Sequence, residues 1–168
     1  GGAGASTLRG NAGNDTVIGN VGNDRVFGGA GADEVNGGAG DDFVGGQGGS
    51  GDTVIGGLGN DTLDGGAGND ILSETGDVDF TLTDVQLDGL GVDVLIDLEA
   101  ARITGGAGDN TIDASGFTGN VTVLGSGGDD VIIGGPGNDL LRGNSGNDQI
   151  FGDLGDDRIF GDSGADTL

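Results

Sequence analysis

The chain has 168 residues, of which 44 are glycine and only 33% are hydrophobic, and it contains no cysteine, histidine or methionine. Its net charge of −24 comes from 29 acidic residues against 5 basic ones. This composition excludes disulfides, thiolate or imidazole metal sites and a transmembrane helix, and it argues against a nucleic-acid partner. Because apolar residues are few and charge repulsion is strong, we expect the chain to fold only when cations neutralise it.

The first 73 residues consist of tandem copies of a nine-residue unit. From Gly10 the copies read GNAGNDTVI, GNVGNDRVF, GGAGADEVN and GGAGDDFVG, and after one extra residue QGGSGDTVI, GGLGNDTLD and GGAGNDILS. Position six is Asp and position eight is Val or Leu in all of these copies. The glycines suit a tight loop and positions seven to nine suit a short strand. Two copies therefore predict one coil of a parallel solenoid with the aliphatic side chains inside.

Residues 74–104 interrupt this period. The alternation of Val78, Phe80 and Leu82 indicates a strand, and the stretch from Asp88 resembles a degraded repeat. Leu95 and Ile103 keep the spacing of the inward-facing aliphatic residues. The sequence thus predicts a solenoid that continues with one or two longer loops, and a small helix over Leu98–Ile103 is the alternative interpretation.

The nine-residue period returns over residues 105–168. It begins with GGAGDNTID and continues from Gly125 with GSGGDDVII, GGPGNDLLR, GNSGNDQIF, GDLGDDRIF and GDSGADTL. The intervening unit, 114–124, is two residues too long and has Val121 and Val123 in its strand. We expect one continuous solenoid domain, part of a longer protein, with an N-terminal array (1–73), an irregular segment (74–104) and a C-terminal array (105–168).

The Asp side chains at position six form the candidate metal site. Residues 18 apart stack in neighbouring coils about 4.8 Å apart, which places Asp15 beside Asp33 and Asp24 beside Asp42. Stacked carboxylates repel each other unless cations lie between them, and oxygen donors without nitrogen or sulfur favour calcium. Turn formation alone does not explain Asp at position six while position five varies. The predicted metal ligands are Asp15, Asp24, Asp33, Asp42, Asp52, Asp61, Asp70, Asp130, Asp139, Asp148, Asp157 and Asp166, with Asp79 added because it lies 18 residues after Asp61.

The ladder of carboxylates weakens in the middle of the chain. Asn110 stands at position six, where it contributes an oxygen but no charge. We therefore expect two runs of calcium ions separated by a metal-poor segment. Aliphatic packing holds that segment together in this prediction, through Leu95, Ile103, Ile112 and Val121 or Val123.

The repeating unit resembles the G-G-x-G-x-D-x-U-x nonapeptide of repeats-in-toxin (RTX) proteins, and the resemblance covers residues 1–73 and 105–168. It implies an all-β, right-handed parallel β-roll, or β-helix solenoid, with about 8–10 Ca²⁺ in its turns. It also implies that backbone carbonyls of loop positions one to four complete the shell of each ion. Examples of these carbonyls are those of Gly28, Gly29, Ala30, Gly31, Gly37, Gly38, Ala39, Gly40, Gly143, Asn144, Ser145 and Gly146.

The resemblance further implies a calcium-binding module that folds in extracellular calcium. Such a module serves as a structural and secretion domain of a protein exported by type I secretion, outside or on the surface of a bacterium. Two other interpretations are the C-terminal part of a secreted RTX protease, lipase or epimerase, and a segment of a surface adhesin or S-layer protein. No catalytic residue is predicted.

Calcium ions are the expected partners. Apolar residues at the outward-facing position nine predict a further contact with another protein surface. They suggest lateral association or packing of an adjacent domain, although scattered surface residues on short strands explain them equally well. These residues are Ile18, Phe27, Ile55, Ile133, Phe151 and Phe160.

Overall fold

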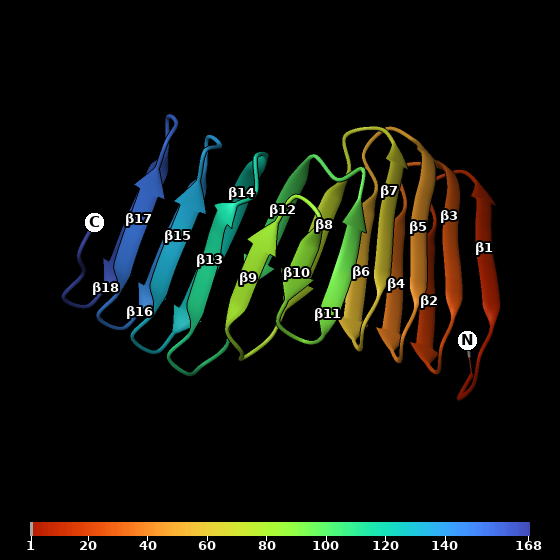
Figure 1. Ribbon diagram of the computed structural model, residues 1–168, viewed down its shortest axis with the longest axis horizontal. Helices are drawn as coiled ribbons and strands as arrows, with labels where there is room; N and C mark the ends of the chain where they lie inside the picture. The colour runs from red at the N-terminus through yellow and green to blue at the C-terminus, as the bar shows by residue number, and fades with distance from the viewer. Residues whose placement is uncertain (1) are drawn as a thin grey trace. The chain divides into compact units, whose positions relative to one another are not determined.

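The chain is a parallel β-solenoid of the β-roll type. The computed structural model describes residues 2–168, and within them every regular element is a β-strand (Figure 1). The chain divides into two compact units, Gly1–Glu74 with Leu90–Ala100, and Thr75–Gly89 with Ala101–Leu168. The predicted all-β, parallel fold is confirmed, and residues 74–104 are shared between the two units.

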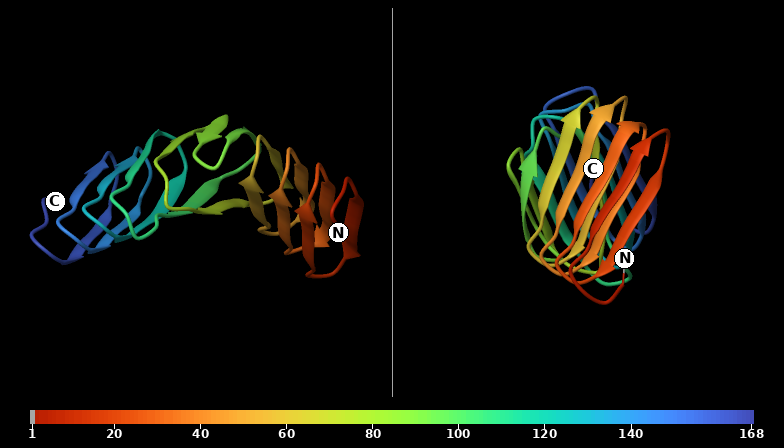
Figure 2. Two further views of the ribbon diagram at one scale, coloured as in Figure 1. Left: turned by 90° about the horizontal axis from the view of Figure 1, so that it is seen from below. Right: turned by 90° about the vertical axis from the view of Figure 1, so that its right-hand side faces the viewer.

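In the first unit, successive strands alternate between two parallel sheets. One sheet has the order β1-β3-β5-β7-β11 and the other β2-β4-β6-β8. Equivalent residues of successive coils pair directly, as Val26 does with Val44. Figure 2 shows β1 to β7, coloured red to yellow, following one another as coils. The strands are β1 (Thr7–Ala12), β2 (Thr16–Val21), β3 (Arg25–Gly31), β4 (Glu34–Ala39), β5 (Phe43–Gly49), β6 (Thr53–Leu58), β7 (Thr62–Ala67), β8 (Ile71–Thr75) and β11 (Val92–Ile96).

The second unit has the same construction with one antiparallel addition. Its sheets have the orders β10-β9-β13-β15-β17 and β12-β14-β16-β18. β9 pairs antiparallel with β10, and its other edge pairs parallel with β13 through Phe80 and Ile112. The strands are β9 (Phe80–Thr83), β10 (Gln86–Asp88), β12 (Ala100–Thr104), β13 (Thr111–Gly116), β14 (Asn120–Gly127), β15 (Val131–Gly135), β16 (Leu140–Ser145), β17 (Gln149–Asp153) and β18 (Arg158–Ser163).

The alternative of a helix over Leu98–Ile103 is wrong. β12 occupies most of that range, and its Ala101 and Ile103 are buried while Arg102 between them is exposed. This alternation has the period of two residues that a strand requires. The strand predicted from Val78, Phe80 and Leu82 is confirmed for the last two, which lie in β9 and are buried, whereas Val78 precedes the strand.

The aliphatic residues at position eight form the core between the sheets. Within the arrays they are buried, which confirms the inward-facing positions there, whereas Leu8, Ile159 and Leu168 in the first and last coils are half-buried or exposed. The buried members are Val17, Val26, Val35, Val44, Val54, Leu63 and Leu72 in the first unit and Ile112, Ile132, Leu141 and Ile150 in the second. Leu95, Ile103, Val121 and Val123 are buried as well, so the predicted core positions in the irregular repeats are also confirmed.

Phe27 departs from the prediction that position nine is exposed. Its side chain is only 7% exposed, whereas Ile18 at the same position of the preceding repeat is 45% exposed. The guanidinium groups of Arg9 and Arg25 lie 4.3 and 5.6 Å from the centre of the Phe27 ring, and the Phe43 ring lies 5.6 Å away. These side chains cover the ring from outside, a contribution that hydrophobic periodicity does not reveal.

Candidate metal centre

The turns between strands hold backbone carbonyls in the space between neighbouring coils. Gly29 and Gly31, at positions two and four of their repeat, have φ angles of 124° and 145°. A Cβ atom on either glycine would collide with a carbonyl oxygen of the preceding coil, at Asn11 or Gly13. Glycine at these positions therefore lets the carbonyls of positions two and four point toward the next coil.

Carbonyls of the later coil point back into the same space. A Cβ atom on Gly10, at position one, would lie 2.6 Å from the carbonyl oxygen of Gly28, one coil later. The position-three carbonyl of Ala30 accepts the N–H of Gly13 in the preceding coil at 2.8 Å. Positions one and three of one loop thus face positions two and four of its neighbour, so carbonyls of loop positions one to four border the space between neighbouring coils.

In the first unit, the position-six side chains form two continuous ladders. Oδ1 of each Asp after Asp15 accepts a hydrogen bond from the backbone N–H of the equivalent residue one coil earlier, as Asp33 does from Asp15 at 2.8 Å. Ladder A consists of Asp15, Asp33, Asp52, Asp70 and Glu99. Ladder B consists of Asp24, Asp42, Asp61 and Asp93.

The second unit has two corresponding ladders. In ladder C the hydrogen bonds join Asn110, Asp130, Asp148 and Asp166. In ladder D they join the N–H of Val121 to Asp139 and the N–H of Asp139 to Asp157. Ladders A to D bring together all the Asp pairs predicted from the 18-residue spacing, apart from the pair that involves Asp79.

Asp79 does not stack on Asp61. Its Oδ1 instead accepts the N–H of Thr111 at 2.7 Å, in the second unit. The place beside Asp61 is taken by Asp93, whose Oδ1 lies 2.9 Å from the Asp61 nitrogen. After Glu74, two residues 18 apart no longer lie in neighbouring coils. Residues 75–88 are inserted there, before the loop that carries Asp93.

Sequence reasoning also missed Glu99, which ends ladder A. Its Oε2 accepts the N–H of Asp70 at 2.7 Å, so a longer acidic side chain replaces Asp at this position. Asp93 had a recognisable signal, since Gly91 and Leu95 flank it with the spacing of a normal repeat. Glu99 had none, because no glycine-containing loop precedes it.

In ten of the ladder Asp residues, the second carboxylate oxygen is buried and lacks a hydrogen-bond partner. The Asp side chains inside the ladders are at most 4% exposed. Burying a charged oxygen without compensation is strongly unfavourable, so each of these atoms is placed to bind a cation. The atoms are Oδ2 of Asp15, Asp24, Asp33, Asp42, Asp52, Asp61, Asp70, Asp130, Asp139 and Asp148.

In several loops the orphaned oxygen lies in a cradle that also contains a backbone carbonyl. The Cβ position on Gly10 is 2.7 Å from Asp15 Oδ2 and 2.6 Å from the Gly28 carbonyl oxygen. Among residues 2–168, no three His, Cys, Asp or Glu side chains converge closely enough to hold a metal on their own. A cation here therefore needs backbone oxygens in its shell, and the mixture of carboxylates and carbonyls fits calcium, which binds six to eight oxygens.

The electrostatics of the ladders favour the same conclusion. Burial, with a smaller contribution from the neighbouring ladder carboxylates, raises the pKa of Asp61 to about 7 and that of Asp130 to about 6. Burial likewise raises the pKa values of Asp42, Asp52, Asp70 and Asp139. Without cations, the fold therefore disfavours the ionised form of these groups.

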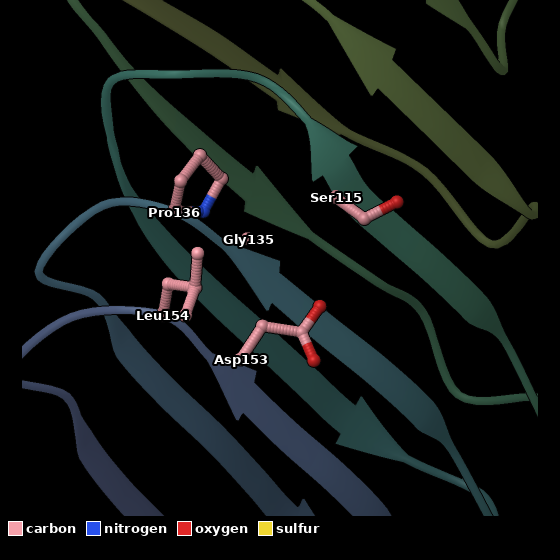
Figure 3. Close-up of a pocket in the computed structure, with 5 residues that line it drawn as sticks. All are labelled: Ser115, Gly135, Pro136, Asp153 and Leu154. Atoms are coloured by element: carbon pink, nitrogen blue, oxygen red, sulfur yellow. The ribbon is translucent and has the colours of Figure 1, made fainter.

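A shallow pocket of about 360 Å³ lies outside the ladders, in the second unit (Figure 3). Ser115 and Asp153 supply its polar side chains, and Pro136 and Leu154 supply its apolar ones. None of these residues belongs to ladder C or D, so the pocket is not part of the candidate metal centre.

The sequence matches the family model of the RTX calcium-binding nonapeptide repeat over residues 1–26, 18–51, 47–73, 101–116, 115–141 and 133–168. The chain belongs to this family. It is a calcium-binding RTX module, and its β-roll is a structural domain. No curated protein matches the sequence. Within residues 2–168, no helix is long and apolar enough to cross a membrane.

Proposed function

We propose that this RTX module folds when extracellular calcium binds between its coils, and that it serves as a structural and secretion domain of an exported protein. The observation that carries the proposal is the row of buried Asp Oδ2 atoms without partners. The proposed carboxylate ligands are Asp15, Asp24, Asp33, Asp42, Asp52, Asp61, Asp70 and Asp93 in the first unit, and Asp130, Asp139, Asp148, Asp157 and Asp166 in the second. Asp79 is not among them.

Calcium binding and folding are coupled in this proposal because the sites exist only between stacked coils. An unfolded chain separates the two loops that supply each ion, so the binding free energy becomes folding free energy. Each ion also offsets two of the charges that give the chain its net charge of −24. Without calcium, the folded state contains unpaired buried carboxylates and is therefore less favourable than the unfolded state.

Coupling to calcium suits a protein that crosses an envelope before it folds. Calcium sites of extracellular modules typically have Kd values of about 10⁻⁴–10⁻³ M, far above cytosolic calcium. Such a chain stays unfolded inside the cell and folds after export by type I secretion. The secreted, bacterial context follows from the family resemblance, and any activity of a parent protein would be carried by other segments.

Circular dichroism of the calcium-free chain tests the coupling. Calcium added to the millimolar range should convert a coil spectrum into a β spectrum in a cooperative transition. Magnesium should fail, because it demands a rigid octahedral shell and retains its waters. An equally strong β spectrum after chelation of calcium would overturn the proposal.

A further inference from the structure

Glu74 occupies an unusual position at the end of the coils in the first unit. It stands at position one of its repeat, where the preceding copies from Gly10 to Gly65 have glycine or Gln47. Residues 75–88 follow it, and the loop resumes at Leu90, whose carbonyl accepts the N–H of Gly59. The loop facing residues 56–61 is therefore split between Glu74 and residues 90–93.

The Glu74 side chain turns back into the space between the coils. It is only 3% exposed, and its Oε1 accepts hydrogen bonds from the N–H groups of Gly56 and Gly57. A carboxylate has two oxygens and about four lone-pair positions, so these bonds leave it able to bind a cation. Burial, with a smaller contribution from the charges of Asp93 and Asp61, raises the pKa of Glu74 to about 7.

Glu74 Oε1 takes the place that a backbone carbonyl has in the regular loops. The Cβ position on Gly37 is 2.9 Å from the carbonyl oxygen of Gly56, one coil later. On Gly56, the corresponding position is 3.2 Å from Glu74 Oε1 and 2.7 Å from Asp61 Oδ2. A charged oxygen thus replaces a neutral one beside an Asp oxygen that is buried and has no partner.

We propose that Glu74 is a side-chain ligand of the calcium ion between loop 56–61 and the split loop, and that this ion holds the two parts of the split loop together. The inference rests on the proposed calcium-dependent folding. The two loops that border this site carry three acidic residues, Asp61, Glu74 and Asp93, where regular loops provide two. Backbone carbonyls still complete the shell, because these three side chains do not converge closely enough to hold a metal on their own. Calcium affinity rises with the number of charged ligands, so this site binds calcium more tightly than its neighbours in ladder B.

Glu74→Gln separates this role from a purely structural one. Glutamine keeps the Oε1 acceptor for Gly56 and Gly57 but removes the charge. The matched control is Glu34→Gln, because Glu34 is an exposed acidic residue at position seven, the first residue of β4, outside loop positions one to six. Calcium titrations of the full chain, followed by hydrogen–deuterium exchange, report residues 53–63 and residues 129–150 separately.

Glu74→Gln should raise the calcium midpoint for protection of residues 53–63 by about tenfold. Residues 129–150 should keep the wild-type midpoint, and Glu34→Gln should match the wild type throughout. An unchanged midpoint in Glu74→Gln would show that Glu74 only caps backbone N–H groups and would overturn the inference. If the wild type showed no calcium-dependent protection anywhere, the proposed function itself would fail.

A second variant is needed if residues 53–63 of Glu74→Gln show no protection from hydrogen–deuterium exchange at any calcium concentration. Glu74→Asp retains the charge on a side chain shorter by one methylene. Recovery of calcium-dependent protection in Glu74→Asp would support ligation by the carboxylate. Equal loss in both variants would assign Glu74 a packing role and overturn the inference.

Discussion

The backbone N–H of Asp61 donates a hydrogen bond to Oδ1 of Asp93 at 2.9 Å, although 32 residues separate the two. Elsewhere in ladders A and B, the same bond between Asp residues joins positions 18 or 19 apart. Residues 75–88 are therefore an insertion that leaves the stacking of the first unit intact. Ladder B continues through Asp93.

Asp93→Asn should weaken calcium-dependent folding of the first unit, whereas Asp79→Asn should leave it unchanged. Asparagine keeps the Oδ1 acceptor in both cases, so the two variants differ only in where a charge is lost. We expect the calcium midpoint of the circular dichroism transition to rise by about threefold or more for Asp93→Asn. Equal midpoints for the two variants would contradict the assignment of Asp93 to the ladder.

Removal of an interior ladder charge should have a larger effect than removal of a terminal one. Asp33 lies between Asp15 and Asp52 in ladder A, so its carboxylate borders two inter-loop spaces. Asp15 begins the ladder and borders one. Asp33→Asn should therefore raise the calcium midpoint more than Asp15→Asn does, measured by the same titration. The idea of shared ligation fails if Asp15→Asn has the larger or an equal effect.

The nine-residue period predicted the regular repeats well because one local pattern determines loop, strand and inward-facing residue together. Val26, Val35 and Val44 are buried as that pattern requires. The pattern could not give the length of the insertion after Glu74, since the return point depends on pairing between β7 and β11. It also could not predict the burial of Phe27, which comes from long side chains on neighbouring strands.

Acidification should stabilise the calcium-free fold. The pKa values of Asp61 and Asp130 are raised to about 7 and about 6 from an ordinary value of 3.8, so the folded state favours their protonated forms. This stabilisation is present below about pH 4 and is lost as the pH rises through 6 to 7. With calcium chelated, the β signal in circular dichroism should be stronger at about pH 5.5 than at about pH 7.5. A stronger signal at the higher pH would contradict the raised pKa values.

Protons should also compete with calcium for the same carboxylates. The calcium midpoint should accordingly rise as the pH is lowered from about 7.5 to about 5.5, because bound calcium requires ionised ligands. Asp61→Asn should reduce this pH dependence, since it removes a group that titrates in that range. A midpoint independent of pH would exclude Asp61 and Asp130 from calcium binding.

Phe27→Ala should destabilise the calcium-loaded first unit more than an exposed residue at the same repeat position does. The variant lacks the buried ring and its contacts to Arg9 and Arg25. We expect this loss to lower the free energy of unfolding by about 2–3 kcal/mol. Ile18→Ala is the matched control, because Ile18 is 45% exposed and should cost less than about 1.5 kcal/mol. Urea unfolding at saturating calcium measures both, and equal costs would show that the arginine cover contributes no stability.

The first site of ladder C should lack calcium. Asn110 Oδ1 occupies the cradle, 2.6 Å from the Cβ position on Gly105, where other repeats have an Asp oxygen. It already accepts the N–H of Gly106 at 2.8 Å, and Asn110 Nδ2 donates to Asp77 at 3.3 Å. Asp130 is therefore the only charged position-six residue between loops 105–110 and 125–130, and one carboxylate binds calcium much more weakly than two.

Anomalous scattering from crystals grown in calcium locates the ions. Peaks should lie between loops 125–130 and 143–148, where Asp130 and Asp148 both contribute, and should be absent between loops 105–110 and 125–130. The double variant Asn110→Asp, Asp77→Asn should add a peak at the vacant position, because it supplies the second carboxylate and removes the acidic neighbour that would repel it. A fully occupied peak beside Asn110 in the wild type would show that two carboxylates are not required for a site in this chain.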